Sequence, residues 1–293
     1  MRPTTVTFWG VRGSIPTPGR STRKYGGNTS CIEIDMNEAL IICDAGTGAR
    51  ELGLDLVGRT SDPMVAHMFF SHAHWDHIQG FPFFVPAYSP ANEVRVYGTQ
   101  PGDERFYNLI SGQMGDAYFP VKFSDLGAKM ISDDIGEGVV AGVKVRWLAQ
   151  THPGGSFGYS FEFDGVRVVY ATDNELDLQL ADQDLPTRDP EALRILPDRQ
   201  VDFVRNADLL IADSQYTDEE YVTKVGWGHP RYTTVVDLAV QGNVKKLALT
   251  HHDPLHSDAD LDKKVEHAAA RARSHGSNVQ VFGAREGVQL LLP

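Results

Sequence analysis

The chain has 293 residues, and its 27 lysines and arginines against 39 aspartates and glutamates give a formal net charge of −12. Proteins that bind nucleic acid through phosphates present a basic surface, so this charge argues against DNA and RNA as partners, and likewise against a polybasic membrane anchor. Two cysteines are too few for a disulfide scaffold, and 41% hydrophobic with 23% charged residues is typical of a globular protein.

Short apolar or alternating runs, bounded by glycine, proline, asparagine or aspartate, predict the β-strands. They cover residues 5–9, 31–33, 40–43, 64–70, 94–97, 143–148, 158–163, 166–170, 209–211, 247–249 and 279–282. Helical patterns lie between them, with a capping box at 217–220 and longer helices over 232–241 and 258–274. Strands and helices therefore alternate, which predicts an α/β fold, and no linker separates two cores. We expect a single domain over residues 1–293.

Two long segments interrupt this alternation. Residues 99–130 contain aromatic side chains without a clean period, and residues 174–200 are acidic and hold three prolines. Each segment is either a lid over a site or a surface insertion.

The sequence carries no signal for membrane insertion or export. No run approaches the roughly 18 uninterrupted apolar residues of a membrane-spanning helix. The first ten residues enter a strand pattern without the apolar core of a signal peptide. We therefore expect a cytoplasmic protein without a membrane partner. Its oligomeric state stays open, a homo-oligomer included.

The strongest chemical signal is the run S-H-A-H-W-D-H at residues 71–77. His72 and His74 are two residues apart at the end of an expected strand, so in an extended chain both imidazoles point to the same side. Asp76 and His77 follow where the chain turns, and they can reach the same point from another angle. Imidazoles and carboxylates suit zinc, iron or manganese, and without neighbouring cysteines a closed structural zinc site is not expected.

Further expected strands also end in a histidine or an aspartate. These residues are His152, Asp173, Asp213 and His251. In α/β sheets the carboxyl ends of strands carry the functional site. His152, Asp173 and His251, together with the three histidines and the aspartate of the run at 71–77, supply seven ligands, enough for two metals that share Asp173. Two metals about 3.5–4 Å apart can bridge a hydroxide and stabilise the oxygens of a displacement.

At this point the chain resembles the metallo-β-lactamase superfamily, and within it the phosphodiesterase branch. The sequences FWGVRGSIPT at 8–17 and GGNTS at 26–30 are similar to the branch's N-terminal loop, and His229 lies 22 residues before His251. The resemblance covers nearly the whole chain and implies a four-layer α/β/β/α sandwich. It also implies two divalent metals, zinc first and manganese or iron as alternatives. One metal would be held by His72, His74 and His152 and the other by Asp76, His77 and His251, with Asp173 bridging.

The resemblance also implies a reaction. His229 would contact the scissile phosphate or protonate the leaving oxygen, and Asp76 is the second catalytic candidate. The expected substrate is a small anionic phosphodiester, namely a cyclic nucleotide, a sugar cyclic phosphate or a short oligonucleotide. The branch's ribonuclease carries a tRNA-gripping arm between the third histidine and the bridging aspartate, whereas only 20 residues separate His152 from Asp173 here. Together with the net charge, this spacing predicts that no large nucleic acid is a partner.

Other polar residues are secondary candidates. Asp44 and Asp213 either hydrogen-bond a ligating imidazole or act as turn residues. Arg12 either meets an anionic substrate or forms a structural salt bridge, and Arg231 is a candidate phosphate contact.

Alternatives remain for one metal ligand and for the function. Neighbours at a strand end point opposite ways, so only one of His251 and His252 should bind metal, and we favour His251. A thioesterase or lactonase would use the same metal centre. A redox or metal-binding protein is the alternative from a different class.

Overall fold

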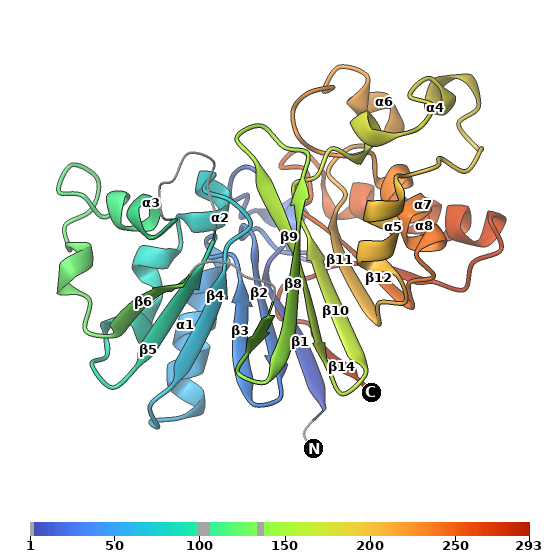
Figure 1. Cartoon of the computed structure of the whole chain (residues 1–293). Coiled ribbons are helices and arrows are strands. Elements are labelled where there is room, and N and C mark those ends of the chain that lie inside the picture. Colours follow the sequence, from blue (N-terminus) through green and yellow to red (C-terminus); the bar gives the residue numbers. More distant parts are fainter. Residues whose placement is uncertain (1–2, 99–105, 134–137) are drawn as a thin grey trace. The chain divides into compact units, whose positions relative to one another are not determined.

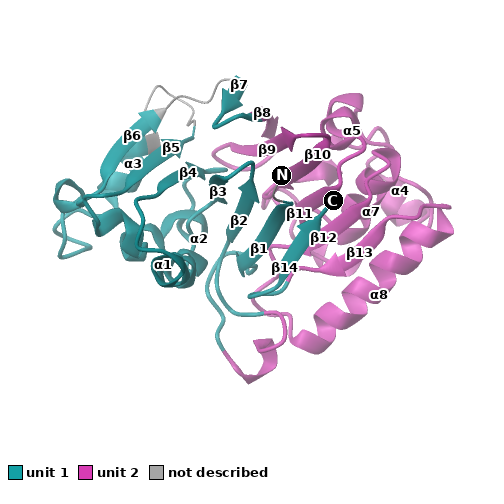
Figure 2. Cartoon of the chain, turned by 90° about the horizontal axis from the view of Figure 1, so that it is seen from below, with its two compact units in different colours: residues 1–18, 26–143, 285–293 teal, residues 19–25, 144–284 magenta. Residues whose placement is uncertain are grey.

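The computed structural model describes residues 3–98, 106–133 and 138–293. The chain divides into two compact units, which Figure 2 shows in different colours. Unit 1 consists of residues 1–18, 26–143 and 285–293, and unit 2 of residues 19–25 and 144–284. Each unit is therefore assembled from separated stretches of sequence. The expectation of one domain over residues 1–293 stays a prediction.

Unit 1 contains a seven-stranded mixed sheet (Figure 1). Its strands are β1 (Thr4–Gly10), β2 (Cys31–Met36), β3 (Ala39–Cys43), β4 (Val65–Phe69), β5 (Glu93–Tyr97), β6 (Lys129–Asp133) and β14 (Gln289–Leu292). They lie in the order β14-β1-β2-β3-β4-β5-β6. The pairs from β14 to β3 are antiparallel, and those from β3 to β6 are parallel.

One face of this sheet is buried under helix. The α-helices of unit 1 are α1 (Gly48–Arg59), α2 (Trp75–Ile78) and α3 (Phe106–Gly112). Leu52 of α1 belongs to the same buried cluster as Met68 of β4 and Val96 of β5. Ala66 and Met68, alternate residues of β4, both belong to this cluster, which fixes the face that β4 turns to the helices. The chain that leaves β4 at Phe70 therefore starts the 71–77 run from a fixed position.

The second sheet also has seven strands. They are β7 (Gly138–Val140), β8 (Val143–Gln150), β9 (Ser156–Phe163), β10 (Val166–Ala171), β11 (Leu209–Asp213), β12 (Lys246–Thr250) and β13 (Gln280–Gly283). Their order is β13-β12-β11-β10-β9-β8-β7. The strands β10 to β13 are parallel, while β8, β9 and β10 pair antiparallel. The carboxyl ends of β10, β11 and β12 consequently lie at one edge of the sheet.

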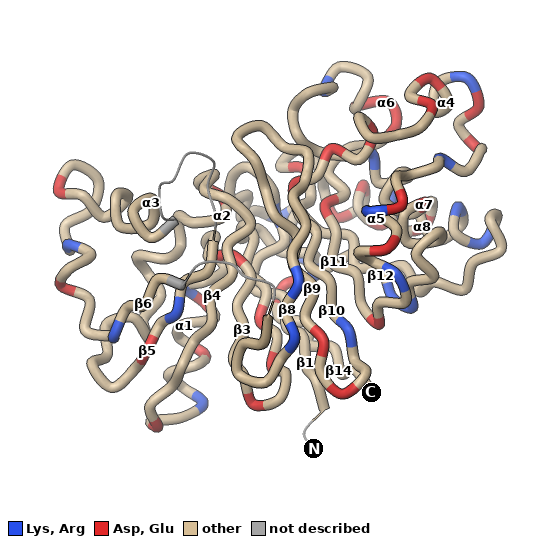
Figure 3. Tube along the Cα trace, viewed as in Figure 1, with Lys and Arg blue, Asp and Glu red and all other residues tan. Residues whose placement is uncertain are grey.

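Unit 2 contains the three helices predicted from the sequence and two further helices that were not predicted. The further helices are α4 (Leu185–Arg188) and α5 (Asp198–Val204), and the predicted ones are α6 (Asp218–Tyr221), α7 (Tyr232–Gln241) and α8 (Asp258–Ser274). Val235 and Leu238 of α7 share a buried cluster with Leu210 of β11 and Leu247 of β12. α6 and α8 both begin with a capping box, which satisfies backbone N–H groups at their first turns. Figure 3 shows acidic residues on α6 and in the chain on either side of α4.

The α/β class predicted from the sequence is confirmed, and each expected strand is present. The predicted helices 232–241 and 258–274 coincide with α7 and α8. Of the expected insertion 99–130, residues 99–105 lie outside the described residues, and the rest contains α3, the 3-10 helix Phe123–Asp125 and the start of β6. The segment 174–200 contains the 3-10 helix Leu176–Gln179, α4 and the start of α5. In the part of the chain that the structure describes, no helix is long and apolar enough to cross a membrane.

Candidate metal centre

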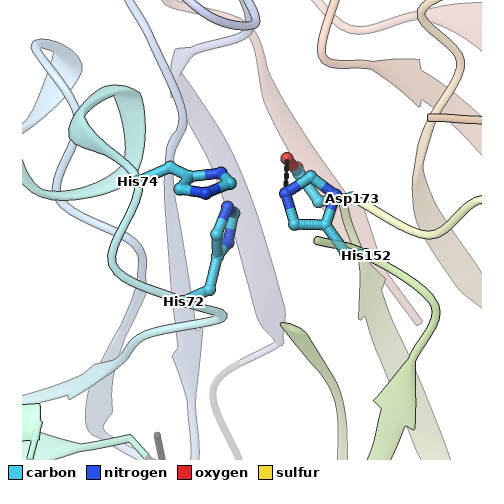
Figure 4. Close-up of side chains that lie close together, drawn as sticks. All are labelled: His72, His74, His152 and Asp173. Carbon is cyan, nitrogen blue, oxygen red and sulfur yellow. Dashed lines mark ion pairs between the residues drawn. The ribbon is translucent and has the colours of Figure 1, made fainter. Parts of the chain in front are cut away.

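Unit 1 contributes the residues of the 71–77 run. His72 is buried directly after β4, His74 is the exposed N-cap of α2, and Asp76 and His77 lie in the first turn of this helix. The ring centroids of His72 and His74 are 4.5 Å apart, and those of His72 and His77 are 4.3 Å apart. Figure 4 shows the imidazole of His74 next to that of His72. The turn from strand to helix thus gathers three imidazoles.

Asp44, at the end of β3, orients two of these imidazoles. Its Oδ2 accepts a hydrogen bond from Nδ1 of His77 at 2.8 Å and another from Oγ of Ser71 at 2.8 Å, and its Oδ1 accepts from the Ser71 backbone N at 2.7 Å. Because the Ser71 hydroxyl donates to Asp44, it accepts from Nδ1 of His72 at 3.0 Å. Both rings therefore carry their proton on Nδ1, so Nε2 is the nitrogen that could bind a metal.

Asp76 is positioned by the N-terminal loop. Its Oδ2 accepts from the backbone N of Ser14 at 2.8 Å and lies 3.2 Å from Nε2 of His77. Ser14 belongs to the sequence stretch 8–17 and has a φ of 63°. This loop therefore fixes a carboxylate oxygen beside the nitrogen that His77 offers to a metal.

Unit 2 contributes His152 after β8, Asp173 after β10 and His251 after β12. Nε2 of His152 lies 3.7 Å from Oδ2 of Asp173, the pair joined by a dashed line in Figure 4, and Nε2 of His251 lies 3.3 Å from Oδ1. Nδ1 of His152 donates to the Gly228 carbonyl at 2.9 Å, and Nδ1 of His251 donates to Oε1 of Gln215 at 2.9 Å. These two imidazoles also turn Nε2 toward a shared carboxylate.

His229 and Asp213 complete a compact group in unit 2. One ligand atom from each of Asp173, Asp213, His229 and His251 lies within 4.8 Å of the others, and all four residues are buried. His229 donates from Nδ1 to Oδ2 of Asp213 at 2.8 Å, and its ring stacks on His251 with centroids 4.8 Å apart. The sequence left open whether Asp213 hydrogen-bonds an imidazole or is a turn residue. In the structure it orients the imidazole of His229.

Glu175 holds the loop that carries His229, and sequence reasoning missed it. Its buried carboxylate accepts from the Tyr221 hydroxyl at 2.7 Å and from the backbone N atoms of Gly226 and Gly228 at 2.6 and 2.7 Å. These partners lie about 50 positions away in sequence, so no local sequence pattern predicts these hydrogen bonds. Gln215 was missed for a similar reason, because only the folded chain brings it to His251. Ser71 adjoins His72 in the sequence, but its hydrogen bond to Asp44 forms only in the folded chain.

Gly228 meets a strict steric requirement in this loop. Its φ is +92°, and a Cβ at this position would lie 2.1 Å from Nδ1 of His152. A residue with a side chain would therefore collide with the imidazole that the Gly228 carbonyl now orients.

The two candidate arginines are engaged elsewhere. Arg231 donates from its backbone N and from Nη1 to Asp177, both at 2.8 Å, and its guanidinium lies 4.1 Å from the ring centroid of Tyr221. Burial raises the pKa of Asp177, while Thr234 and Arg231 act in the opposite direction. Arg12 is buried and donates from Nε to the Gly26 carbonyl at 2.8 Å. The structure does not place either arginine among the metal-site residues.

The ambiguous pair at the end of β12 separates in space. His251 faces Asp173 as described above, whereas Nε2 of His252 lies 3.0 Å from the Ala284 carbonyl. The ring of His252 also makes an edge contact with Tyr25, with centroids 5.5 Å apart. Of the two histidines, only His251 belongs to the groups that could hold a metal ion.

Three of these residues have a left-handed backbone. Asp44, Asp173 and His251 have φ values of 59°, 49° and 54°. This conformation costs a residue other than glycine roughly 1–2 kcal/mol, somewhat less for aspartate. Such strain is often found at functional sites, because the surrounding structure holds it in place.

Comparison with known proteins agrees with this geometry. Residues 40–252 match the sequence family described as the Beta-lactamase superfamily domain. Ribonuclease Z of Methanosarcina acetivorans is 25% identical over 285 residues, covering 86% of this chain and 88% of its own length. The structures of the metallo-beta-lactamase fold protein YhfI from Bacillus subtilis and of the short form of human tRNase Z are each 17% identical, cover 99% of both chains, and have TM-scores of 0.69 and 0.65. The sandwich fold expected from the sequence is confirmed.

These relatives overturn one expectation. The net charge and the short spacing between His152 and Asp173 predicted that no large nucleic acid is a partner, and this is wrong, because relatives that cover most of the chain are ribonucleases. Net charge is a sum over the whole surface, whereas binding depends on the local field, to which bound metal ions contribute large positive charges.

Proposed function

Because this chain belongs to the β-lactamase superfamily, we propose that the candidate ligands of unit 1 and unit 2 together bind two divalent metal ions. With these ions the protein hydrolyses a phosphodiester bond of RNA. The chain is a metal-dependent hydrolase of the phosphodiesterase type. The proposal adds the number of metals, the residues that hold them and the substrate.

The observation that carries this proposal is the orientation of four imidazoles. His72, His77, His152 and His251 each use Nδ1 in a hydrogen bond to an oxygen acceptor. An outer hydrogen bond of this kind is the usual partner of a metal-ligating histidine, because it fixes the tautomer and leaves the Nε2 lone pair for the ion. Two of these histidines belong to unit 1 and two to unit 2, so the imidazoles of both units are oriented by the same kind of hydrogen bond.

The donor chemistry suits divalent ions. Imidazole nitrogens and carboxylate oxygens without thiolates fit zinc, with manganese and iron as alternatives. In our assignment His72, His74 and His152 hold one ion, Asp76, His77 and His251 hold the other, and Asp173 is shared. Metals bound there supply Lewis-acid stabilisation of the phosphoryl oxygens and lower the pKa of a coordinated water.

His229 acts on the leaving group. Its Nδ1 proton is held by Asp213, so Nε2 is the nitrogen that can meet the substrate. The Asp213 carboxylate orients the imidazole, so that Nε2 can donate a proton to the departing oxygen. Glu175 keeps the loop of His229 in place through the backbone of Gly226 and Gly228.

The substrate assignment rests on the ribonuclease relatives, and one feature narrows it. β9 and β10 form a direct hairpin in which Phe163 pairs with Val166, so no arm is inserted between His152 and Asp173. This hairpin favours a short or single-stranded RNA segment at the site. It is also the observation that favours a second candidate, a small phosphodiester such as a cyclic nucleotide or a sugar cyclic phosphate.

The test is a cleavage assay with metal-reconstituted protein and four substrates: a precursor tRNA with a 3′ trailer, a short single-stranded RNA, cyclic nucleotides and bis(p-nitrophenyl) phosphate. We expect cleavage of RNA, and losses of at least about 100-fold in kcat for Asp76→Ala and His229→Ala. The matched control is His267→Ala, which removes an exposed histidine of α8. Cleavage of cyclic nucleotides alone would favour the second candidate. No cleavage by protein that holds two metals would reject phosphodiester hydrolysis and direct the assay to thioesters and lactones.

A further inference from the structure

Unit 1 has an uncharged cavity of about 630 Å³ against the metal-binding run. Its lining is mostly aromatic and aliphatic, and none of the lining side chains carries a charge. The residues that line it are Ala73, Trp75, Ile78, Gln79, Pro82, Phe83, Leu109, Gly112, Gln113, Tyr118 and Phe119. In a chain of net charge −12, such a surface favours a planar, neutral group.

The aromatic rings of the lining are unusually exposed. Trp75 and Tyr118 retain 79% and 80% of their accessible surface, and Phe83 retains 52%. Phe83 and Phe119 pack edge to face with ring centroids 5.4 Å apart, which fixes part of the wall. Exposed apolar patches of this kind mark binding surfaces, and aromatic faces are the side chains on which nucleobases stack.

The cavity and the metal-site residues share one stretch of backbone. Ala73 lies between His72 and His74, and Trp75 lies between His74 and Asp76. A group bound against Trp75 therefore lies beside the run to which our proposed function assigns the ions.

Two amides add hydrogen-bonding capacity to the wall. Gln113 donates from Nε2 to the Ile78 carbonyl at 3.1 Å, and Gln79 donates from Nε2 to Oγ1 of Thr29 at 3.3 Å. Each contact uses the amide nitrogen and fixes its side chain. The carbonyl oxygens of both glutamines are acceptors that suit the N–H groups of a nucleobase.

We propose that this cavity binds the nucleobase next to the scissile phosphate, which stacks on Trp75 and Tyr118. This inference rests on the proposed phosphodiester hydrolysis, because it assigns a subsite of the same substrate. The cavity sets a preference for diesters that carry a base, and it requires no basic residue to do so.

The kinetic test compares two diesters with the same leaving group, the p-nitrophenyl ester of thymidine 5′-monophosphate and methyl p-nitrophenyl phosphate. We expect the wild type to prefer the thymidine ester in kcat/KM, and Tyr118→Ala and Trp75→Ala to reduce this preference at least about fivefold through KM. Tyr118→Phe keeps the ring and should retain the preference. Leu54→Ala is the matched control, because it removes an exposed apolar side chain of unit 1 outside the cavity. An unchanged preference in Tyr118→Ala and Trp75→Ala would overturn the inference.

A filling variant and a binding measurement complete the test. A Cβ at Gly112 would meet no atom within 4 Å, so the leucine side chain of Gly112→Leu can fill part of the cavity without a clash at the backbone. This variant should reduce the preference for the thymidine ester as the alanine variants do. Quenching of tryptophan fluorescence by thymidine, which has no phosphate, should occur in the wild type and weaken in Trp75→Phe. If neither ester is hydrolysed but thymidine still quenches Trp75, the proposed function fails and the base site stands. If thymidine causes no quenching, the base site is refuted.

Discussion

Replacement of Glu175 by glutamine tests how the His229 loop is held. The glutamine keeps the shape of the side chain and one carbonyl oxygen, which can still accept from Tyr221 and Gly226. Its amide N–H₂ must then face the backbone N–H of Gly228, which now donates to Oε2 at 2.7 Å. A buried N–H without an acceptor costs about 1–3 kcal/mol, and the two remaining bonds to a neutral acceptor each weaken by about 1 kcal/mol. The expected loss is thus about 3–5 kcal/mol.

Two measurements follow this loss. Urea unfolding reports the free energy, and hydrogen exchange of the Gly226 and Gly228 amides reports whether the loop is the part that opens. Because the Gly228 carbonyl accepts from His152, zinc binding should also weaken about 10- to 100-fold. Glu219→Gln, at an exposed glutamate of α6, is the control for the change in charge. If Glu175→Gln unfolds and binds zinc as the wild type does, Glu175 does not position this loop.

Three further substitutions test other contacts. Gly228→Ala would place Cβ 2.1 Å from Nδ1 of His152 at a φ of +92°, so we expect at least about 1–3 kcal/mol of destabilisation in urea unfolding; wild-type stability would contradict the described loop. Asp44→Asn removes an acceptor from either His77 or Ser71, so zinc binding should weaken about 10- to 100-fold in a chelator competition. An unchanged zinc affinity would show that Asp44 does not orient a metal ligand. Burial and the nearby Lys264 lower the pKa of His256 below its ordinary value of 6.5. As pH falls below about 6.5 the unfolded chain binds the proton first, so stability is lost, and His256→Gln should flatten this loss between pH 7.5 and 5.5 in urea unfolding; an equal slope would refute this contribution.

The regular elements were largely predictable from local sequence. Residues 232–241 and 258–274 carry helical periodicity over several turns, and both appear with the expected bounds. The helix α1 was not predicted, because Gly48, Gly53 and Gly58 weaken its propensity and its burial against the sheet supplies the stability instead. The short strands β7 and β14 depend on pairing with their neighbours, which no local pattern shows.

The candidate metal ligands were easier to predict from the sequence than the residues that orient them. Strand ends place His and Asp side chains at one edge of a sheet, a rule that can be applied to a sequence. Gln215 and Glu175 act through contacts that form only after folding, and so does Ser71 in its hydrogen bond to Asp44. Arg231 followed a motif and had a plausible role, but its charge is neutralised by Asp177 in the folded chain.

The left-handed backbone at Asp44, Asp173 and His251 implies that substitutions which raise thermal stability at these positions would lower activity. Glycine or asparagine accepts these φ values with less strain, so a library selected only for survival at high temperature would enrich such replacements. The enriched variants would keep both sheets and lose two carboxylates and an imidazole to which our proposed function assigns the metal site. A directed-evolution campaign on this protein therefore needs a second selection step that counts bound metal, applied in every round.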